Sequence, residues 1–310
     1  MTNIAFLFPG QGSQYVGMGK EFYENFPQAK AVFDEADQVL GRKISELCFA
    51  GPEEALKDTR NAQPAIFTVS IAAWKVLTAE GIRADYVAGH SLGEYSALVA
   101  SGALTFAEAL CLLNRRAQFM AGADPDHKGT MAAVLGIDRA SLMPLLSEAA
   151  SFGRVEAANY NCPGQIVISG EKTGIAKAQE AIAAQGGRMI PLAVSGPFHS
   201  SLMRPAAEAF RPELEACHWK DPAIPLIANV SARPVLAFDM ADSLYRQIFS
   251  AVLWEDTLRF LAEKAITTYI EIGPGKVLTG LTKKTLKDVT LLGCEDPGSL
   301  KKALAILKEV

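Results

Sequence analysis

A strand, a glycine-flanked serine and a helix follow one another between residues 85 and 100. Asp85–Ala88 reads as a weak strand, Gly89-His90-Ser91-Leu92-Gly93 follows directly, and Glu94–Ala100 is helix-like. The central segment matches G-x-S-x-G, in which a strained turn between strand and helix presents the serine hydroxyl. Its glycines let the two backbones approach closely. A glycine-rich turn with an incidental serine is the alternative, but the flanking strand and helix favour an α/β fold with Ser91 as a nucleophile.

The length and composition allow a large core without indicating a large charged surface. Of the 310 residues, 49% are hydrophobic, which suits one big α/β domain or a large domain with a smaller insert. The formal net charge of −4 comes from nearly balanced acids and bases. We therefore expect no nucleic-acid partner and no binding to an anionic membrane surface.

The five cysteines are scattered and include no C-x-x-C pair, so the sequence indicates reduced thiols and no zinc or redox centre. Residues 1–8 lack the basic start of a signal peptide, and apolar stretches such as Ala65–Trp74 are too short to span a bilayer. These features predict a cytoplasmic enzyme or scaffold, with no membrane partner and no metal.

The order of the expected elements predicts a small domain inserted at about residues 126–196. It follows a polar, turn-rich stretch at 122–126 and has the order βαββαβ, the split-βαβ arrangement of a ferredoxin-like domain. The large domain would then comprise residues 1–125 and 197–310. The elements expected in the insert are Thr130–Leu135, Asp138–Ala150, Val155–Ala158, Gln165–Ser169, Thr173–Gln185 and Arg188–Val194.

The large domain is expected to alternate helices with short buried strands. Apolar residues that recur every three or four positions place one face of each helix against the core. The expected helices are Ala31–Leu47, Ala62–Glu80, Phe106–Ala121, Ser200–Ala216 and Leu253–Lys264. The expected strands are Asn3–Phe8, Asp85–Ala88, Pro225–Val230 and Tyr269–Ile272.

A nucleophilic serine needs a base, and histidine is the usual choice because its pKa lies near neutrality. The chain has four histidines. His199 stands in the loop between the insert's last strand and a helix, from which a side chain can project into a cleft. His90 is better interpreted as a packing residue, His127 as a solvated linker residue and His218 as a helix-flanking residue. His199 is therefore the candidate base.

An acid that orients the imidazole usually lies between serine and histidine in the chain order of such hydrolases. Asp124 and Asp126 lie there in the polar linker, and Asp138 opens a helix of the insert. None of the three stands in a distinctive setting. A backbone carbonyl can also accept the second imidazole proton, so the Ser-His pair does not require an acid.

The loop Pro9-Gly10-Gln11-Gly12-Ser13-Gln14 can bring a backbone N–H to the edge of the cleft. With the N–H of Leu92, it would stabilise a tetrahedral oxyanion, each such donor being worth roughly 10²–10³ in rate. The rival interpretation is a nucleotide-binding glycine loop. Tyr15 occupies the position where G-x-G-x-x-G requires its last glycine, and no G-K-[ST] follows, so nucleotide binding is not favoured.

Arg115 and Arg116 lie in the otherwise apolar helical stretch Phe106–Ala121. Such a pair more often forms a solvated face with its aliphatic stems packed on the helix. If one arginine points inward, its planar guanidinium would hold a carboxylate through two parallel hydrogen bonds, as a dicarboxylic acyl group would require. The residues alone leave both alternatives open.

These motifs together resemble the malonyl-CoA:acyl-carrier-protein transacylases of fatty-acid synthesis and the acyltransferase domains of polyketide synthases. The resemblance runs through nearly the whole chain. It rests on Phe8-Pro9-Gly10-Gln11-Gly12-Ser13-Gln14, Gly89-His90-Ser91-Leu92-Gly93-Glu94-Tyr95, Arg116, Asn159-Tyr160-Asn161, Gln165, Ile168-Ser169-Gly170, Gly196-Pro197-Phe198-His199, Gln247, Trp254 and Glu271-Ile272-Gly273-Pro274-Gly275.

The resemblance implies an α/β-hydrolase-like large domain with an inserted ferredoxin-like small domain. It implies Ser91 as the nucleophile, His199 as its base and Arg116 as the partner of the malonyl carboxylate. The main-chain carbonyl of Gln247 would take the place of the acid.

Three further roles follow from the same resemblance. Gln11 and Leu92 would supply the oxyanion N–H groups. Phe198 resembles the residue of malonyl-selective members, because a bulky side chain there leaves less room for an α-methyl branch. Pocket shape alone discriminates one methyl group by only about 1–3 kcal/mol, so some methylmalonyl transfer is compatible with it.

The implied activity is transfer of the malonyl group from malonyl-CoA to the phosphopantetheine thiol of acyl carrier protein through a Ser91 acyl-enzyme, for fatty-acid synthesis. Malonyl-CoA and acyl carrier protein are the expected partners, with no cofactor and a monomeric chain. The alternatives are a polyketide-synthase trans-acting acyltransferase or an editing acyl hydrolase of the same family, and an inactive scaffold that binds a carrier protein.

Overall fold

The computed structural model describes residues 3–308, and β1 (Ile4–Phe8) lies at the centre of its parallel sheet. The strand order of this five-stranded sheet is β7-β2-β1-β8-β9. Every residue of β1 is buried, with the even-numbered ones packed in one cluster and Ala5 and Leu7 in another. Both faces of the sheet are therefore covered, as is usual for parallel strands. The other strands are β2 (Tyr86–Gly89), β7 (Leu226–Ile227), β8 (Thr268–Ile272) and β9 (Thr290–Cys294).

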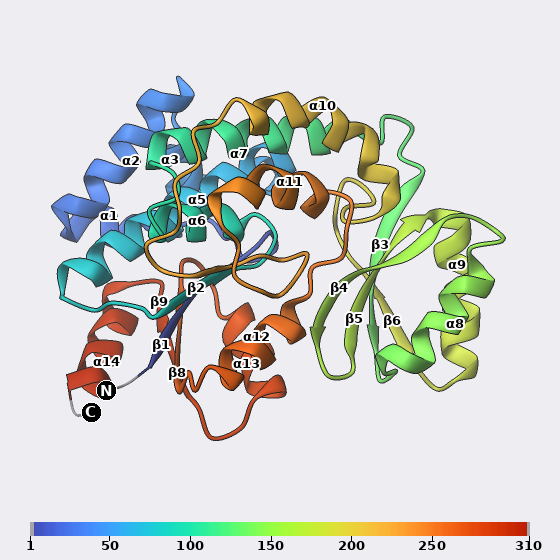
Figure 1. Ribbon diagram of the computed structural model, residues 1–310. Helices are drawn as coiled ribbons and strands as arrows, with labels where there is room; N and C mark the ends of the chain where they lie inside the picture. The colour runs from blue at the N-terminus through green and yellow to red at the C-terminus, as the bar shows by residue number, and fades with distance from the viewer. Residues whose placement is uncertain (1–2, 309–310) are drawn as a thin grey trace.

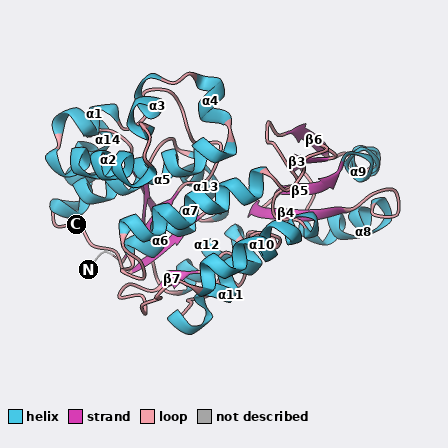
Figure 2. Cartoon of the chain, turned by 90° about the horizontal axis from the view of Figure 1, so that it is seen from above, coloured by secondary structure: helices cyan, strands magenta, loops and turns pink. Residues whose placement is uncertain are grey.

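Helices surround the parallel sheet (Figures 1 and 2). Residues of α2, α5, α6 and α7 join the larger hydrophobic cluster, and residues of α12 and α13 join the smaller one. The helices of this part are α1 (Lys20–Asn25), α2 (Pro27–Leu40), α3 (Ile44–Ala50), α4 (Glu53–Lys57), α5 (Thr59–Ala79), α6 (Gly93–Ala100), α7 (Phe106–Ala121), η1 (Ser201–Met203), α10 (Arg204–Glu215), α11 (Ala237–Gln247), α12 (Trp254–Glu263), α13 (Val277–Thr285) and α14 (Pro297–Lys308).

A separate four-stranded antiparallel sheet, with order β4-β5-β3-β6, stands to the right in Figure 1. Its elements follow the expected sequence of strand, helix, two strands, helix and strand, and it has a hydrophobic cluster of its own. Two helices pack on it. The elements are β3 (Gly129–Leu135), α8 (Arg139–Ala149), β4 (Val155–Cys162), β5 (Gln165–Glu171), α9 (Lys172–Ala184) and β6 (Arg188–Pro191).

The antiparallel sheet is joined to the large unit by backbone hydrogen bonds to Val252, in the segment between α11 and α12. Val252 donates to the carbonyl of Ala158 at 2.8 Å, and Tyr160 donates to the carbonyl of Val252 at 2.9 Å. Arg139 of α8 also pairs with Asp256 of α12 at 3.2 Å. These contacts fix the antiparallel unit beside the carboxyl ends of β1 and β2, where the catalytic candidates lie.

The structure differs from the sequence-based expectations in several elements. The single helix expected at Ala31–Leu47 is wrong, because Gly41 adopts a left-handed conformation that ends α2 before α3 begins. The strand expected at Pro225–Val230 is only the two-residue β7. Neither α11 nor β9 was expected. Within residues 3–308, no helix combines the length and the apolar composition needed to cross a membrane.

Candidate active site

Ser91 occupies the sharp turn between β2 and α6, as the pentapeptide predicts. Its φ of 52° lies in the left-handed region, which is unusual for a residue with a side chain. The turn closes because its glycines have no Cβ atom. A Cβ on Gly89 would lie 1.9 Å from the carbonyl oxygen of Gly93, and a Cβ on Gly93 would lie 2.2 Å from that of Phe8. The strained backbone is therefore held by contacts that only glycine permits.

His199 lies within hydrogen-bond distance of the Ser91 hydroxyl. Its Nε2 is 2.8 Å from Ser91 Oγ, and its Nδ1 is 2.8 Å from the main-chain oxygen of Gln247. A carbonyl oxygen can only accept, so Nδ1 carries the proton and Nε2 is free to accept the serine proton. Burial, followed by the nearby charge of Arg116, lowers the pKa of His199 to about 3. The imidazole is therefore neutral at physiological pH, as a base must be.

Within the described residues, no other histidine and none of the candidate acids is hydrogen-bonded to the Ser91 hydroxyl or to His199, although His90 lies beside the cavity at Ser91. His127 and His218 are exposed, while the ring of His90 packs beside Trp254 with its Nε2 3.0 Å from Asn161 Oδ1. Asp124 accepts hydrogen bonds from the backbone of Lys128 and Gly129, Asp126 pairs with Lys128, and Asp138 caps α8. A carbonyl oxygen, rather than an acid, accepts the second imidazole proton.

Arg116 and Arg115 leave α7 in different directions. Arg115 is half-exposed and pairs with Glu213 at 3.0 Å. Arg116 is fully buried and donates to Gln63 Oε1 at 2.6 Å, to Gln247 Oε1 at 2.8 Å and to Ser91 Oγ at 3.1 Å. Burial lowers its pKa, but a guanidinium stays charged in proteins. Among the described residues, no carboxylate forms a salt bridge with it, so its charge faces the Ser91 hydroxyl without a direct counterion.

A cavity of about 90 Å³ adjoins the Ser91 hydroxyl. Phe198 and Met131 contribute apolar walls, and Gln11 and Leu92 also line it. Neither the backbone N–H of Gln11 nor that of Leu92 has a hydrogen-bond partner within residues 3–308. The cavity thus combines the candidate nucleophile, the candidate base and two backbone N–H groups without a hydrogen-bond partner in the described residues.

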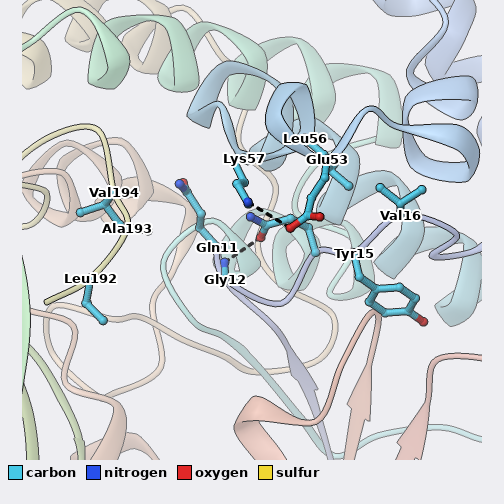
Figure 3. A pocket seen from close by; sticks show the side chains of 11 residues that line it. Gln11, Gly12, Tyr15, Val16, Glu53, Leu56, Lys57, Leu192, Ala193 and Val194 are labelled. Atoms are coloured by element: carbon cyan, nitrogen blue, oxygen red, sulfur yellow. Dashed lines mark hydrogen bonds and ion pairs between the residues drawn. The ribbon is translucent and has the colours of Figure 1, made fainter. Parts of the chain in front are cut away.

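A larger cavity of about 620 Å³ lies next to it and is drawn in Figure 3. Gln11, Leu192 and Val194 line both cavities. In the figure Gln11 lies between the segment Leu192–Val194 and the side chain of Lys57, which pairs with Glu53. The amide of Gln11 donates to Thr59 Oγ1 at 3.0 Å, which fixes this residue at the junction of the two cavities.

Three buried polar residues of the site were not identified from the sequence. Gln63 of α5 holds Arg116, Asn229 holds the turn at Ser91, and Glu94 of α6 accepts from the amide of Gln247 at 2.7 Å. Glu94 is fully buried, and its burial raises its pKa to about 7. Glu94 could have been found as the one charged residue of α6, but no pattern singles out Gln63, because α5 carries several other polar residues.

The chain is similar to known proteins along nearly its whole length. Residues 5–305 match the family model described as acyl transferase domain. The malonyl CoA-acyl carrier protein transacylase of Bacillus subtilis is 49% identical, with 100% of this chain and 98% of the relative covered. The malonyl CoA-acyl carrier protein transacylase of Escherichia coli K12 is 40% identical, with 99% of this chain and 100% of the relative covered.

Solved structures agree in fold. The crystal structure of a malonyl CoA-acyl carrier protein transacylase from Clostridium perfringens superposes with a TM-score of 0.97 at 42% identity, covering 99% of this chain and 98% of that one. A malonyl-transacylase solved in complex with a type II polyketide synthase acyl-carrier protein superposes with a TM-score of 0.96 at 39% identity. The match covers 98% of this chain and 100% of that one. The chain therefore belongs to the acyl transferase family, and within it to the malonyl-CoA:acyl-carrier-protein transacylases.

Proposed function

We propose that this chain transfers the malonyl group of malonyl-CoA to the phosphopantetheine thiol of acyl carrier protein, through an ester on Ser91. The observation that carries the proposal is the buried guanidinium of Arg116, 3.1 Å from the Ser91 hydroxyl and without a carboxylate partner among the described residues. A substrate that bears its own carboxylate next to the reacting thioester fits this arrangement.

In the first step the hydroxyl oxygen of Ser91 attacks the thioester carbonyl, and His199 Nε2 takes the hydroxyl proton. The tetrahedral oxyanion would lie between the backbone N–H groups of Gln11 and Leu92. The carbon–sulfur bond then breaks, His199 returns the proton to the departing thiolate, and CoA leaves with its thiol restored. The Nδ1–H bond to the carbonyl of Gln247 keeps the imidazole oriented and stabilises its transient positive charge.

The second step reverses the first with a different thiol. His199 takes the proton of the phosphopantetheine thiol, whose sulfur attacks the Ser91 ester, and the proton then returns to the serine oxygen. The cavity of about 620 Å³ that adjoins the smaller one offers room for the pantetheine arm of both thiols. Because Arg116 holds the carboxylate, it would also crowd the space that a hydrolytic water needs. No resident metal or organic cofactor takes part in either step.

The finer features of the fold are proposals of the same kind. The strand order β4-β5-β3-β6 and the βαββαβ sequence support a ferredoxin-like domain at residues 126–196. The strand, elbow and helix at Ser91 support an α/β-hydrolase-like domain at 1–125 and 197–310, whose first and last two residues lie outside the described ones.

All proposed site residues come from one chain, which supports an active monomer. The five free cysteines suit the reducing environment of the cytoplasm.

Radiolabelled malonyl-CoA with and without holo acyl carrier protein tests the proposed reaction. We expect the label to reach the carrier rapidly and free malonate to form slowly when the carrier is absent. Release of malonate at the same rate in both samples would instead identify an editing hydrolase. If all of the label stayed on CoA, the protein would be an inactive scaffold that binds a carrier protein.

A polyketide role is the second candidate, because a relative of 39% identity was solved with a polyketide synthase carrier protein. Parallel assays with a fatty-acid carrier and a type II polyketide carrier distinguish the two pathways. Our proposal of fatty-acid synthesis requires a higher kcat/KM for the fatty-acid carrier. A higher kcat/KM for the polyketide carrier would instead assign the protein to polyketide synthesis.

The protonation state of His199 gives a prediction that does not depend on turnover. Because burial lowers the pKa of His199 to about 3, its ring should remain in the neutral, Nδ1-protonated form throughout a titration from pH 8 to about 5. NMR of protein labelled with ¹⁵N-histidine measures the protonation state of His199 directly, and its signals are assigned by their loss in a His199→Ala variant. A His199 midpoint near the ordinary value of about 6.5 would contradict the described environment.

Phe198 gives a prediction about acyl selectivity. It is 5% exposed and lines the smaller cavity beside Ser91, so Phe198→Leu should leave more room for an α-methyl branch. We expect the ratio of kcat/KM for methylmalonyl-CoA to that for malonyl-CoA to rise about 10-fold. This is the order of selectivity that a pocket can achieve against one extra methyl group. An unchanged ratio in the folded variant would show that another wall limits the acyl group.

A further inference from the structure

We propose that Glu94 is a positioning residue for acyl transfer, whose carboxylate fixes the side-chain amide of Gln247 and the turn at Ser91. The inference rests on the proposed function and assigns a role in it to a buried residue that does not touch the reacting atoms. It predicts that the preference for a carboxylated acyl group depends on Glu94 as well as on Arg116.

The hydrogen bonds of the Gln247 side chain fix the orientation of its amide group. Its Nε2 donates to Glu94 Oε2 at 2.7 Å and to the carbonyl of Ser91 at 3.0 Å, while its Oε1 accepts from Arg116 at 2.8 Å. Rotating the amide by half a turn would place its oxygen against two acceptors and its NH₂ group against the guanidinium. Glu94, which as a carboxylate can only accept, therefore helps to hold the one orientation that suits Arg116.

The position of Gln247 affects more than its amide. The main-chain oxygen of the same residue accepts the Nδ1 proton of His199. One residue thus contacts the base through its backbone and the arginine through its side chain. A Gln247 that loses its anchor at Glu94 would loosen both contacts.

Asn229 is the second residue that Glu94 holds. Its backbone N–H donates to Glu94 Oε2 at 3.2 Å. Its side chain spans the strained turn, accepting from the N–H of Ser91 and donating to the carbonyl of Gly89, both at 2.7 Å. Glu94 therefore supports the turn that presents the nucleophile through Asn229, and it directly contacts the Gln247 amide that binds the arginine.

Charge explains why a carboxylate suits this position. Glu94 is fully buried, and its Oε1 has no hydrogen-bond partner within residues 3–308. Burying a carboxylate is costly even with the two hydrogen bonds to Oε2, and burial raises the pKa of Glu94 to about 7. The hydrogen bonds from Gln247 and Asn229 and the charge of Arg116 oppose this shift and favour the ionised form of Glu94. The ionised form of Glu94, one amide away from Arg116, offsets the buried charge of Arg116 without contacting its guanidinium.

Glu94→Gln tests the proposal, because it keeps the shape and removes the charge and the acceptor-only character. Glu271→Gln is the matched control, since Glu271 is also buried and accepts from backbone N–H groups, but at the start of α13. Each variant is assayed with malonyl-CoA and acetyl-CoA for transfer to holo acyl carrier protein, and circular dichroism checks folding.

We expect Glu94→Gln to lower kcat/KM for malonyl transfer about 10- to 100-fold, as small misplacements at a catalytic centre do. The malonyl-to-acetyl ratio should fall about 10-fold, because Arg116 loses its orientation. Glu271→Gln should leave that ratio unchanged. In an Arg116→Ala background, Glu94→Gln should change the ratio no further, since the two residues act through one contact.

An unchanged ratio in folded Glu94→Gln would overturn the proposal. Equal losses in Glu94→Gln and Glu271→Gln with both ratios unchanged would also overturn it, because they would show only a packing role. If Glu94→Gln does not fold, Gln247→Met breaks the same link while keeping the backbone carbonyl, and an unchanged ratio there overturns the proposal equally. Failure of the wild-type protein to transfer malonyl would instead refute the proposed function.

Discussion

Replacing Ser91 by alanine is expected to lower malonyl transfer by about 10⁴-fold or more, the usual consequence of removing a catalytic serine. The hydroxyl is the group that contacts both His199 Nε2, at 2.8 Å, and Arg116, at 3.1 Å. Without it no ester can form, and a direct reaction between the two thiols has no base positioned for it. Transfer of radiolabelled malonyl from CoA to carrier protein measures the loss.

Ser96→Ala is the matched control for this experiment. Ser96 lies on α6, the helix that follows the Ser91 turn, is fully buried, and its hydroxyl has no hydrogen-bond partner among the described residues. It should retain transfer close to the wild-type rate. Substantial malonyl transfer by folded Ser91→Ala would show that the acyl group does not pass through this serine.

Replacing Arg116 by alanine is expected to lower kcat/KM for malonyl transfer about 100-fold while leaving acetyl transfer unchanged or raised. Two charge-assisted hydrogen bonds to the malonyl carboxylate are lost, and each is worth about 1.5–3 kcal/mol. Arg116→Lys should recover only part of the rate, because an ammonium group cannot reproduce the planar, bidentate contact. Malonyl-CoA and acetyl-CoA assayed in parallel give the ratio that measures this effect.

Arg115→Ala controls for the loss of an arginine from the same helix, since its side chain is half-exposed and pairs with Glu213. It should leave the malonyl-to-acetyl ratio unchanged. If Arg116 also crowds out water, the malonyl ester of Arg116→Ala should hydrolyse faster than that of the wild type. Wild-type malonyl transfer, selectivity and hydrolysis in Arg116→Ala would contradict the assignment of a carboxylate anchor.

The nucleophile and base could be proposed from the sequence because their signals are local. Ser91 is marked by the two glycines that flank it, and both are required where strand and helix backbones nearly touch. His199 is marked by its place at the end of the insert, where the chain returns to the large domain. Short-range backbone geometry produces both signals, so neither depends on knowing which distant segments meet.

The supporting residues could not be found in this way. Asn229 lies 138 residues from Ser91 in the chain, and Gln247 lies 153 residues from Glu94. Their pairing depends on how the short β7 and the helix α11 pack against the elbow. The two arginines illustrate the same point, because successive residues on a helix differ by about 100° and the apolar pattern alone does not show which one meets the core.

The fold was predictable where periodicity is strong. The order of strands and helices in the antiparallel unit follows the alternation of its sequence, and the long α5 follows its apolar spacing. Elements whose stability comes from their neighbours were predicted less well. Of the strand expected at Pro225–Val230 only the two residues of β7 form, and β9, which was not expected, is an edge strand that pairs only with β8 within the described residues.

Intact-protein mass spectrometry after exposure to malonyl-CoA, followed by a chase with holo acyl carrier protein, tests the central claim most directly. The account predicts one malonyl adduct on the wild-type chain, located at Ser91 by peptide mapping, absent from Ser91→Ala and lost to the carrier during the chase. Transfer to the carrier without any such adduct, or an adduct that persists in Ser91→Ala, would contradict it.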